Sequence, residues 1–282
     1  PDIFYKKTGD IFNQHSYWTK QPVDAVKYFL KKYSNKEDRV LDPFCGSGMT
    51  GIASNMLGMK CILGDLSPAC LHISEGYNTK FDFLDEDIEK FLVKLKESIG
   101  DIYLTNCKHC GNTAKIKFEV LGEFFKDKNH NIHSDSKDYF LSIKYKKNFN
   151  SKLNGLKKTL EFDKHQVIQI CYQCKCNKTK LFKDPDLNDQ NLIIKLKKIC
   201  KKNPNTSFFG KETKRNIKKK ILKVYQLYSS KNLYALNYIK DQIEKIDNKH
   251  LKKFLLFNFT SILFNCSLMS RYRGYENTSI KM

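Results

Sequence analysis

The stretch Arg39-Val40-Leu41-Asp42-Pro43-Phe44-Cys45-Gly46-Ser47-Gly48-Met49-Thr50 decides the fold of the N-terminal part of the chain. Val40 and Leu41 form a short apolar strand, an acidic residue follows, and a Gly-x-Gly turn leads into an apolar run with helical spacing. Gly46 and Gly48 can adopt positive φ and let a ligand approach the backbone closely. The unpaired amides at the start of the helix would face that ligand.

A second apolar strand, residues 61–63, is followed by Asp65, and Ser67-Pro68 then begins another helix. The order strand, loop, helix, strand, acid, helix predicts half of an open parallel sheet. An acidic side chain at the tip of the second strand of such a unit can accept hydrogen bonds from ribose hydroxyls. The sequence therefore predicts a ligand that contains a nucleoside.

The string from Asp42 to Thr50 is more specific than a bare Gly-x-Gly, and it closely resembles the S-adenosylmethionine loop of the DNA amino-methyltransferases. Residues 15–22 resemble the segment that closes over the methionine end of the cofactor in that family, and the resemblance covers roughly residues 12–78. It implies an α/β fold with a Rossmann-like methyltransferase sheet, partial in this chain. It also implies S-adenosylmethionine as cofactor, with Asp65 at the ribose, Thr19 and Lys20 near the methionine end, and a lining of Asp42, Pro43, Phe44, Cys45, Gly46, Ser47 and Gly48.

Five of the ten cysteines gather in Cys107-Lys108-His109-Cys110 and Cys171-Tyr172-Gln173-Cys174-Lys175-Cys176. Two Cys-x-x-Cys pairs offer four soft thiolates that suit tetrahedral zinc. We therefore predict that Cys107, Cys110, Cys171 and Cys174 bind a structural Zn²⁺ in an inserted zinc-ribbon β subdomain. Strands such as residues 115–120 and 139–143 would bring the pairs together.

Other thiol arrangements stay open at this point. Cys176 could replace Cys174 as a ligand, and a redox pair or unmetallated thiols are the alternatives to zinc. Four histidines are weaker candidates, because solvated loop residues explain them as well: His109, His130, His133 and His165.

The catalytic Asp/Asn-Pro-Pro-aromatic tetrad of the resembled family does not occur in the sequence. Asp184-Pro185-Asp186-Leu187 and Asn203-Pro204-Asn205-Thr206 both lack the second proline and the aromatic ring. In that family the tetrad receives the hydrogens of the target amine and stacks on the flipped base. We therefore assign no catalytic residue, and we expect the tetrad from a missing C-terminal portion or from a partner subunit. The first residue, Pro1, also suggests a piece of a longer chain.

The formal net charge of +21 favours a nucleic-acid partner. However, only four of the 51 basic residues are arginine, and an A/T-rich coding sequence alone would produce such a lysine excess. The most apolar segment, residues 254–269, is shorter than the roughly 20 residues that a bilayer span needs. No secretory signal is apparent, so we expect a cytoplasmic protein without a membrane partner.

We expect a methyltransferase core over residues 1–100, a zinc-ribbon insertion over 101–185, and a basic helical region over 186–282 that returns to the core. The expected function is methylation of an exocyclic amino group in DNA, adenine N6 before cytosine N4, in a restriction-modification or phage-defence system. An RNA guanine-N2-type methyltransferase, which has a similar loop, is one alternative. A non-catalytic zinc-ribbon protein that binds nucleic acid is another. A nicotinamide oxidoreductase is disfavoured because the loop lacks the third glycine of that fingerprint.

Overall fold

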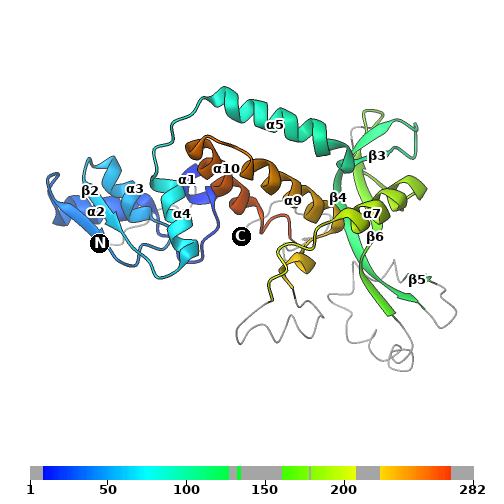
Figure 1. Ribbon diagram of the computed structural model, residues 1–282, viewed down its shortest axis with the longest axis horizontal. Coiled ribbons are helices and arrows are strands. Elements are labelled where there is room, and N and C mark those ends of the chain that lie inside the picture. The colour runs from blue at the N-terminus through cyan, green and yellow to red at the C-terminus, as the bar shows by residue number, and fades with distance from the viewer. Residues whose placement is uncertain (1–8, 127–131, 135–160, 178, 208–222, 268–282) are drawn as a thin grey trace. The chain divides into compact units, whose positions relative to one another are not determined.

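The computed structural model describes residues 9–126, 132–134, 161–177, 179–207 and 223–267. The chain divides into two compact units (Figure 1). Unit 1 consists of Pro1–Leu92 and Tyr238–Cys266, and unit 2 consists of Val93–Asn237 and Ser267–Met282. Both units contain helices and unit 1 has parallel strands, so the expectation of a mixed α/β architecture is confirmed.

Unit 1 is built around a parallel pair of strands and the helix that connects them. Its elements are α1 (Asp10–Gln14), α2 (Val23–Tyr33), β1 (Arg39–Asp42), α3 (Met49–Met56), β2 (Lys60–Leu63), α4 (Pro68–Asn78), the first part of α5 (Asp85–Ile99), the last part of α9 (Ser230–Glu244) and α10 (Lys249–Ile262). β1 pairs with β2 from Arg39↔Lys60 to Asp42↔Leu63. Within the described residues this sheet has two strands, so the wider Rossmann-like sheet stays a prediction.

Glycines let α3 and α4 approach each other closely at the start of α3. A Cβ added at Gly51 would lie 2.3 Å from Oδ1 of Asn78, and one at Gly48 would lie 2.5 Å from Oγ of Ser74. The Asn78 side chain also donates a hydrogen bond of 3.0 Å to the carbonyl of Gly48. The turn before α3 is therefore fixed from α4 as well as from its own strand.

The C-terminal helix α10 packs in unit 1, against α4. The ring of Phe257 occupies the space beside Gly76, where an added Cβ would meet it at 2.1 Å. The Thr260 hydroxyl lies 2.9 Å from Nε2 of His72 on α4. Farther along, Leu251 and Leu255 share a buried cluster with Ile243 of α9 and with half-buried residues that include Phe83 and Phe91.

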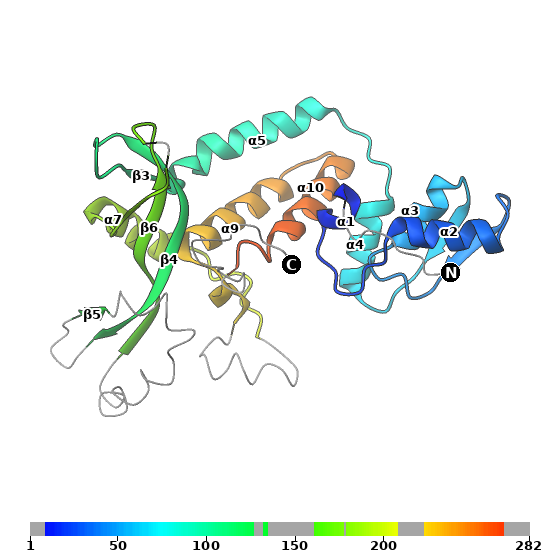
Figure 2. The ribbon, with the colours of Figure 1, turned by 180° about the vertical axis from the view of Figure 1, so that it is seen from behind.

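Unit 2 is organised by an antiparallel sheet whose central strands, β4 and β6, form a long ribbon (Figure 2). Its elements are η1 (Gly100–Tyr103), β3 (Leu104–Asn106), β4 (Thr113–Lys126), β5 (Ile132–Ser134), β6 (Glu161–Gln173), β7 (Leu181–Lys183), α7 (Leu187–Ile199) and η2 (Val224–Leu227), with parts of α5 and α9. The strand order is β3-β4-β6-β7, and β5 pairs with β4. One face of this sheet is the core of the unit, where Ile116, Ile170 and Tyr172 meet Ile193 of α7.

Buried ion pairs hold unit 2 together. Lys183 contacts Asp186 at 2.5 Å and Asp189 at 2.8 Å, and Thr105 of β3 donates to Asp189 at 2.7 Å. Asp186 and Asp189 also form a capping box at the start of α7. Glu119 is paired in the same way with Lys231 of α9, at 2.6 Å, and removing either partner of such a pair would leave an uncompensated buried charge.

Several sequence-based expectations lie outside the described residues. They are the strand at 139–143, the lysine runs at 144–147 and 152–158, most of the basic run at 211–223, and the basic tail at 270–275. No helix in the described part of the chain combines the length and the apolar character that a membrane span requires.

Candidate functional site: a loop pocket in unit 1 and a four-cysteine group in unit 2

A pocket of ≈ 280 Å³ opens beside the loop that follows β1. One wall is the N-terminal segment, with Tyr17, Thr19 and Gln21, and the other is the loop itself together with the first turn of α3. Six of the ten residues predicted to bind a cofactor line this pocket: Thr19, Asp42, Phe44, Cys45, Gly46 and Ser47. The loop and the N-terminal segment thus line the same hollow.

The conformation of the loop depends on its glycines. Gly46 and Gly48 have φ of 51° and 78°, values that favour glycine over residues with a Cβ. Gly46 is also packed against the ring of Tyr17, which an added Cβ would meet at 3.0 Å. Gly48 precedes α3 directly, so the turn ends where the amides of the helix begin.

Asp65 braces the loop from the end of β2. Its Oδ2 accepts a hydrogen bond of 2.9 Å from the amide of Gly46, and its Oδ1 accepts one of 2.9 Å from the amide of Ser67. The amides of Ser67 and Gly46 hold the pKa of the Asp65 carboxyl below its usual value, so the group is ionised at neutral pH. Because a carboxylate oxygen can accept more than one hydrogen bond, Asp65 can still accept from a ligand.

Lys20, which the resemblance placed near the methionine end of the cofactor, has its amine in a buried site away from the pocket lining. The amine donates to the carbonyls of Phe12, at 2.8 Å, and His15, and to the hydroxyl of Tyr77 on α4, at 2.9 Å. Burial lowers its pKa to about 8. Lys20 therefore ties the segment that carries Tyr17 and Thr19 to the helices behind it. Pro43, Gly48 and Asp65 also lie outside the lining of the pocket.

The buried amine gives unit 1 a specific pH dependence. Because the pKa of Lys20 is about 8 in the folded state and 10.5 in the unfolded chain, the unfolded state binds more protons between these values. Folding stability from this group should rise over that interval by up to about 1.4 kcal/mol per pH unit. Lys20→Met removes this contribution to stability. The free energy of unfolding in urea of the wild type, minus that of the variant, should therefore grow from pH 8 to pH 10. Lys31→Met, at an exposed position, is the control. A wild-type-minus-variant difference that stays constant with pH would contradict the assignment.

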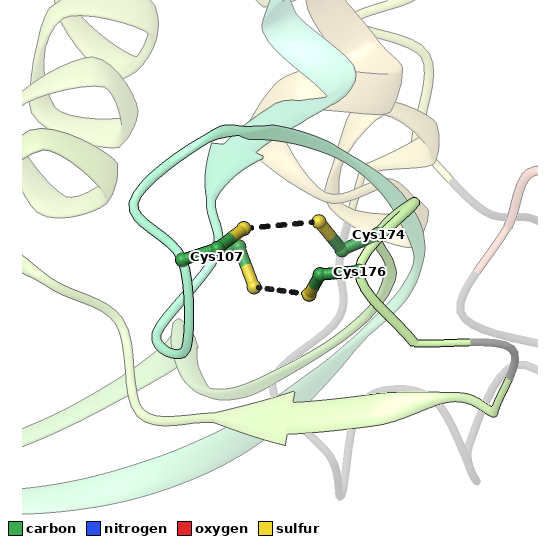
Figure 3. A group of neighbouring side chains, drawn as sticks. Cys107, Cys174 and Cys176 are labelled. Carbon is green, nitrogen blue, oxygen red and sulfur yellow. Dashed lines mark hydrogen bonds between the residues drawn. The ribbon is translucent and has the colours of Figure 1, made fainter.

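Four sulfur atoms come together at one end of the unit 2 sheet. Cys107, Cys110, Cys174 and Cys176 place their Sγ atoms within 4.8 Å of one another. The Sγ atoms of Cys107 and Cys176 are 3.6 Å apart, and those of Cys110 and Cys174 are 3.5 Å apart. Figure 3 shows Cys107 on one segment and Cys174 and Cys176 on another, with their side chains pointing toward one another. A tetrahedron with Zn–S bonds of about 2.3 Å has edges of about 3.8 Å, so the group has the dimensions of a four-thiolate site.

Local backbone contacts build this group. Cys107 accepts a hydrogen bond at its carbonyl from the amide of Gly111, whose φ of 72° closes the first Cys-x-x-Cys turn. Burial alone would raise the pKa of the Cys107 thiol, but the amides of Cys110 and His109 outweigh it and hold the pKa at about 6. The neighbouring thiols raise the pKa of Cys176 to about 12. All four thiols could therefore be ionised together only with a cation between them.

Cys171 is the one residue of the predicted metal set that the structure leaves out of this group, and Cys176 takes its place. In an extended strand, neighbouring side chains point to opposite faces. Tyr172 lies on the core face, with its hydroxyl 3.8 Å from Sγ of Cys107, so Cys171 faces the other way. Cys171 is fully buried there, which raises the pKa of its thiol. The run Val167-Ile168-Gln169-Ile170-Cys171 before Tyr172, rich in β-branched residues as is typical of a strand, is the sequence signal that could have indicated this.

The histidines do not join the metal group in the described part of the chain. His109 is exposed within the first cysteine turn, and the side chains of His133 and His165 and all of His130 lie outside the described positions. The group is thus composed of cysteines alone.

Among known proteins, unit 1 is similar to DNA methylases. Residues 3–76 match the DNA methylase family of N6/N4 type. Over 149 residues the chain is 30% identical to the Type II methyltransferase M.MjaII of Methanocaldococcus jannaschii, a match that covers 52% of this chain and 25% of that protein. The chain thus spans about a quarter of the length of this relative. No solved structure matches the chain.

Proposed function

Because the chain belongs, through residues 3–76, to the N6/N4 amino-methyltransferase family of DNA methylases, we propose that unit 1 binds S-adenosylmethionine for methyl transfer to an exocyclic amino group of DNA. The observation that carries the proposal is the pocket between the N-terminal segment and the glycine loop, at the start of α3. The cofactor supplies an electrophilic methyl group, and the protein's task is to bind and orient it.

The proposal gives the residues around the pocket distinct roles. Asp42, Ser47 and Thr19 offer polar groups in the lining, and Phe44, which is 85% exposed, offers an apolar ring at its edge. Gly46 lets the ligand approach the backbone, and Asp65 both braces that glycine and accepts from the ribose. Lys20 acts on the ligand through the segment it anchors, together with Pro43 and Gly48, which shape the turn.

The catalytic tetrad, in this proposal, comes from polypeptide outside residues 1–282, as a further portion of the protein or as a partner subunit. Two observations support this: the sequence contains no Asp/Asn-Pro-Pro-aromatic tetrad, and the chain spans a quarter of its relative. The wider Rossmann-like sheet would be completed by the same polypeptide. We propose adenine N6 as the target before cytosine N4, and a restriction-modification or phage-defence role, which a Type II methyltransferase relative supports.

We further propose that Cys107, Cys110, Cys174 and Cys176 hold a structural Zn²⁺. The support is the sulfur-to-sulfur spacing of 3.5 and 3.6 Å and the all-thiolate donor set. Four protein ligands leave no open position for water or substrate, so the metal would stabilise unit 2 and take no part in the chemistry.

Calorimetric titration of S-adenosylmethionine into the zinc-loaded chain tests the cofactor site. We expect micromolar binding in the wild type and at least a tenfold loss in Asp65→Ala, because that change removes the ribose acceptor and the brace on Gly46 together. Asp85→Ala, at an exposed position in the first turn of α5, is the matched control and should bind normally. No heat of binding to a folded, zinc-loaded wild-type chain would contradict the proposal.

A further inference from the structure

The positive charge of the chain is divided unequally between the two units. Unit 1 has 16 basic and 16 acidic residues, so the whole net charge of +21 falls on unit 2, with 35 basic and 14 acidic residues. A coding bias toward lysine would act on both units alike. The balance in unit 1 therefore argues that the excess in unit 2 has a function there.

Within unit 2, the segments that form the four-cysteine group are free of acidic residues. Residues 102–118 contain no Asp or Glu, and neither do residues 164–183. These two segments supply β3, the start of β4, most of β6, β7 and all four clustered cysteines. The segments that carry the four cysteines thus contribute only basic and neutral side chains.

Five exposed lysines of these segments make up what we call the lysine surface: Lys108, Lys115, Lys117, Lys175 and Lys180. Lys108 lies inside the first cysteine turn, and Lys175 lies between Cys174 and Cys176. Lys115 and Lys117 share the face of β4 opposite the core residue Ile116. Lys117 and Lys180 are both close enough to Cys171 to favour its ionised form, which brings them to one neighbourhood.

Three of the acidic residues that flank these segments in the sequence are paired with other lysines. Asp186 and Asp189 are paired with Lys183, and Glu119 is paired with Lys231. None of the five lysines of the lysine surface forms an ion pair with a carboxylate within the described residues. Their ammonium groups are therefore available for an anionic partner.

We propose that the lysine surface contacts the phosphate backbone of duplex DNA, so that unit 2 supplies the general DNA affinity and the charge-balanced unit 1 holds the cofactor. The choice of DNA as the polyanion rests on the proposed function. Spread lysines on a sheet favour backbone contact over base readout, because each presents a point charge to a phosphate. Cysteine ligation fixes the turns that carry Lys108 and Lys175, so the metal would set the spacing of two of the contacts.

Fluorescence anisotropy of a labelled 20-base-pair DNA, titrated with the full zinc-loaded chain at several salt concentrations, tests this proposal. The variant replaces all five lysines of the lysine surface by Gln. We expect it to bind at least tenfold more weakly at 100 mM salt. The slope of log K against log salt should fall in magnitude by about 0.9 for each phosphate contact removed, so by about 3 or more.

The matched control replaces five exposed lysines of unit 1 by Gln: Lys31, Lys32, Lys36, Lys60 and Lys80. It removes the same charge, and we expect it to change affinity less than threefold. Equal losses in the two variants, or an unchanged salt slope in the first, would overturn the proposal. So would tighter binding to an RNA duplex of the same sequence. If the variant without the five lysines loses zinc, Lys115→Gln/Lys117→Gln/Lys180→Gln, outside the cysteine turns, decides instead. Three lost phosphate contacts should lower the magnitude of its salt slope by up to about 2.7, and an unchanged slope would overturn the proposal.

The cofactor titration separates this inference from the proposed function. The variant in which Gln replaces the five lysines should bind S-adenosylmethionine as the wild type does, because its substitutions all lie in unit 2. If the wild-type chain does not bind S-adenosylmethionine, the proposed cofactor site in unit 1 is contradicted. Unchanged DNA affinity in the variant would count only against the lysine surface.

Discussion

Cys176→Ala should reduce the bound zinc from one ion per chain to nearly none, whereas Cys171→Ala should leave it unchanged. Cys171 lies within β6 and Cys176 follows that strand. Only Cys176 belongs to the sulfur group, and the buried Cys171 faces the opposite side of the sheet. Binding of a structural zinc by four thiolates has an apparent free energy of about 10–16 kcal/mol, and one lost ligand removes a large part of it.

The pair of variants can be compared by metal analysis and by competition with a chromogenic chelator. We expect Cys176→Ala also to lower the thermal midpoint of unit 2 by more than 10 °C, since several kcal/mol of metal binding act on the folded state only. Cys171→Ala should lower it by a few degrees at most, through the small cavity that it leaves. Retained zinc in Cys176→Ala, or lost zinc in Cys171→Ala, would show that the ligands are the set that the sequence alone suggested.

Gly48→Ala is expected to abolish cofactor binding and to destabilise unit 1. The substitution meets two penalties at once, because φ is 78° and the added Cβ would lie 2.5 Å from Oγ and 2.9 Å from Cα of Ser74. The contact with backbone cannot be relieved by turning a side chain, so the loop must move away from α4. Positive φ alone costs about 1–2 kcal/mol, and the overlap should bring the total above about 3 kcal/mol.

Gly58→Ala is the control for the backbone cost of a positive φ without the steric overlap. Its φ is 72°, and the nearest atom to an added Cβ is the flexible end of Lys36, at 3.1 Å. We expect this variant to lose about 1 kcal/mol of stability in urea unfolding and to bind S-adenosylmethionine like the wild type. If Gly48→Ala binds the cofactor with wild-type affinity, the loop does not form the cofactor site.

The elements of unit 1 that could be predicted from sequence are those with local signals. Strands β1 and β2 and the glycine loop follow from apolar runs, a Gly-x-Gly turn and Pro68 at the first position of α4. The contact through which α10 packs in this unit could not be predicted, because it places Phe257 beside Gly76, 181 positions away, and no local pattern specifies such a pair. The role of Lys20 could not be predicted for the same reason, because one of its hydrogen-bond partners, Tyr77, lies far from it in the sequence.

In unit 2, the two cysteine turns could be predicted, but the choice of ligands could not. Whether Cys171 joins the group depends on which face of β6 its side chain occupies, and one residue of register exchanges the faces, whereas Cys176 lies beyond the end of that strand. The start of α7 also has a local signal, because Asp186 and Asp189 form a capping box where the helical region was expected to begin.

The four-cysteine group also has a consequence for how this protein can change over time. With a metal bound it would join the chain at Cys110 to the chain at Cys174, and between these cysteines β4 pairs with β6 as far as Lys126↔Glu161. The entropy of closing a flexible loop grows only with the logarithm of its length, and doubling the length costs about 0.6 kcal/mol. A longer or shorter connection between the end of β4 and the start of β6 should therefore change the folding free energy little, whereas changes within the paired strands would disturb the core of unit 2. Related proteins could thus differ in the length of this connection while the cysteine group and the two central strands stay the same.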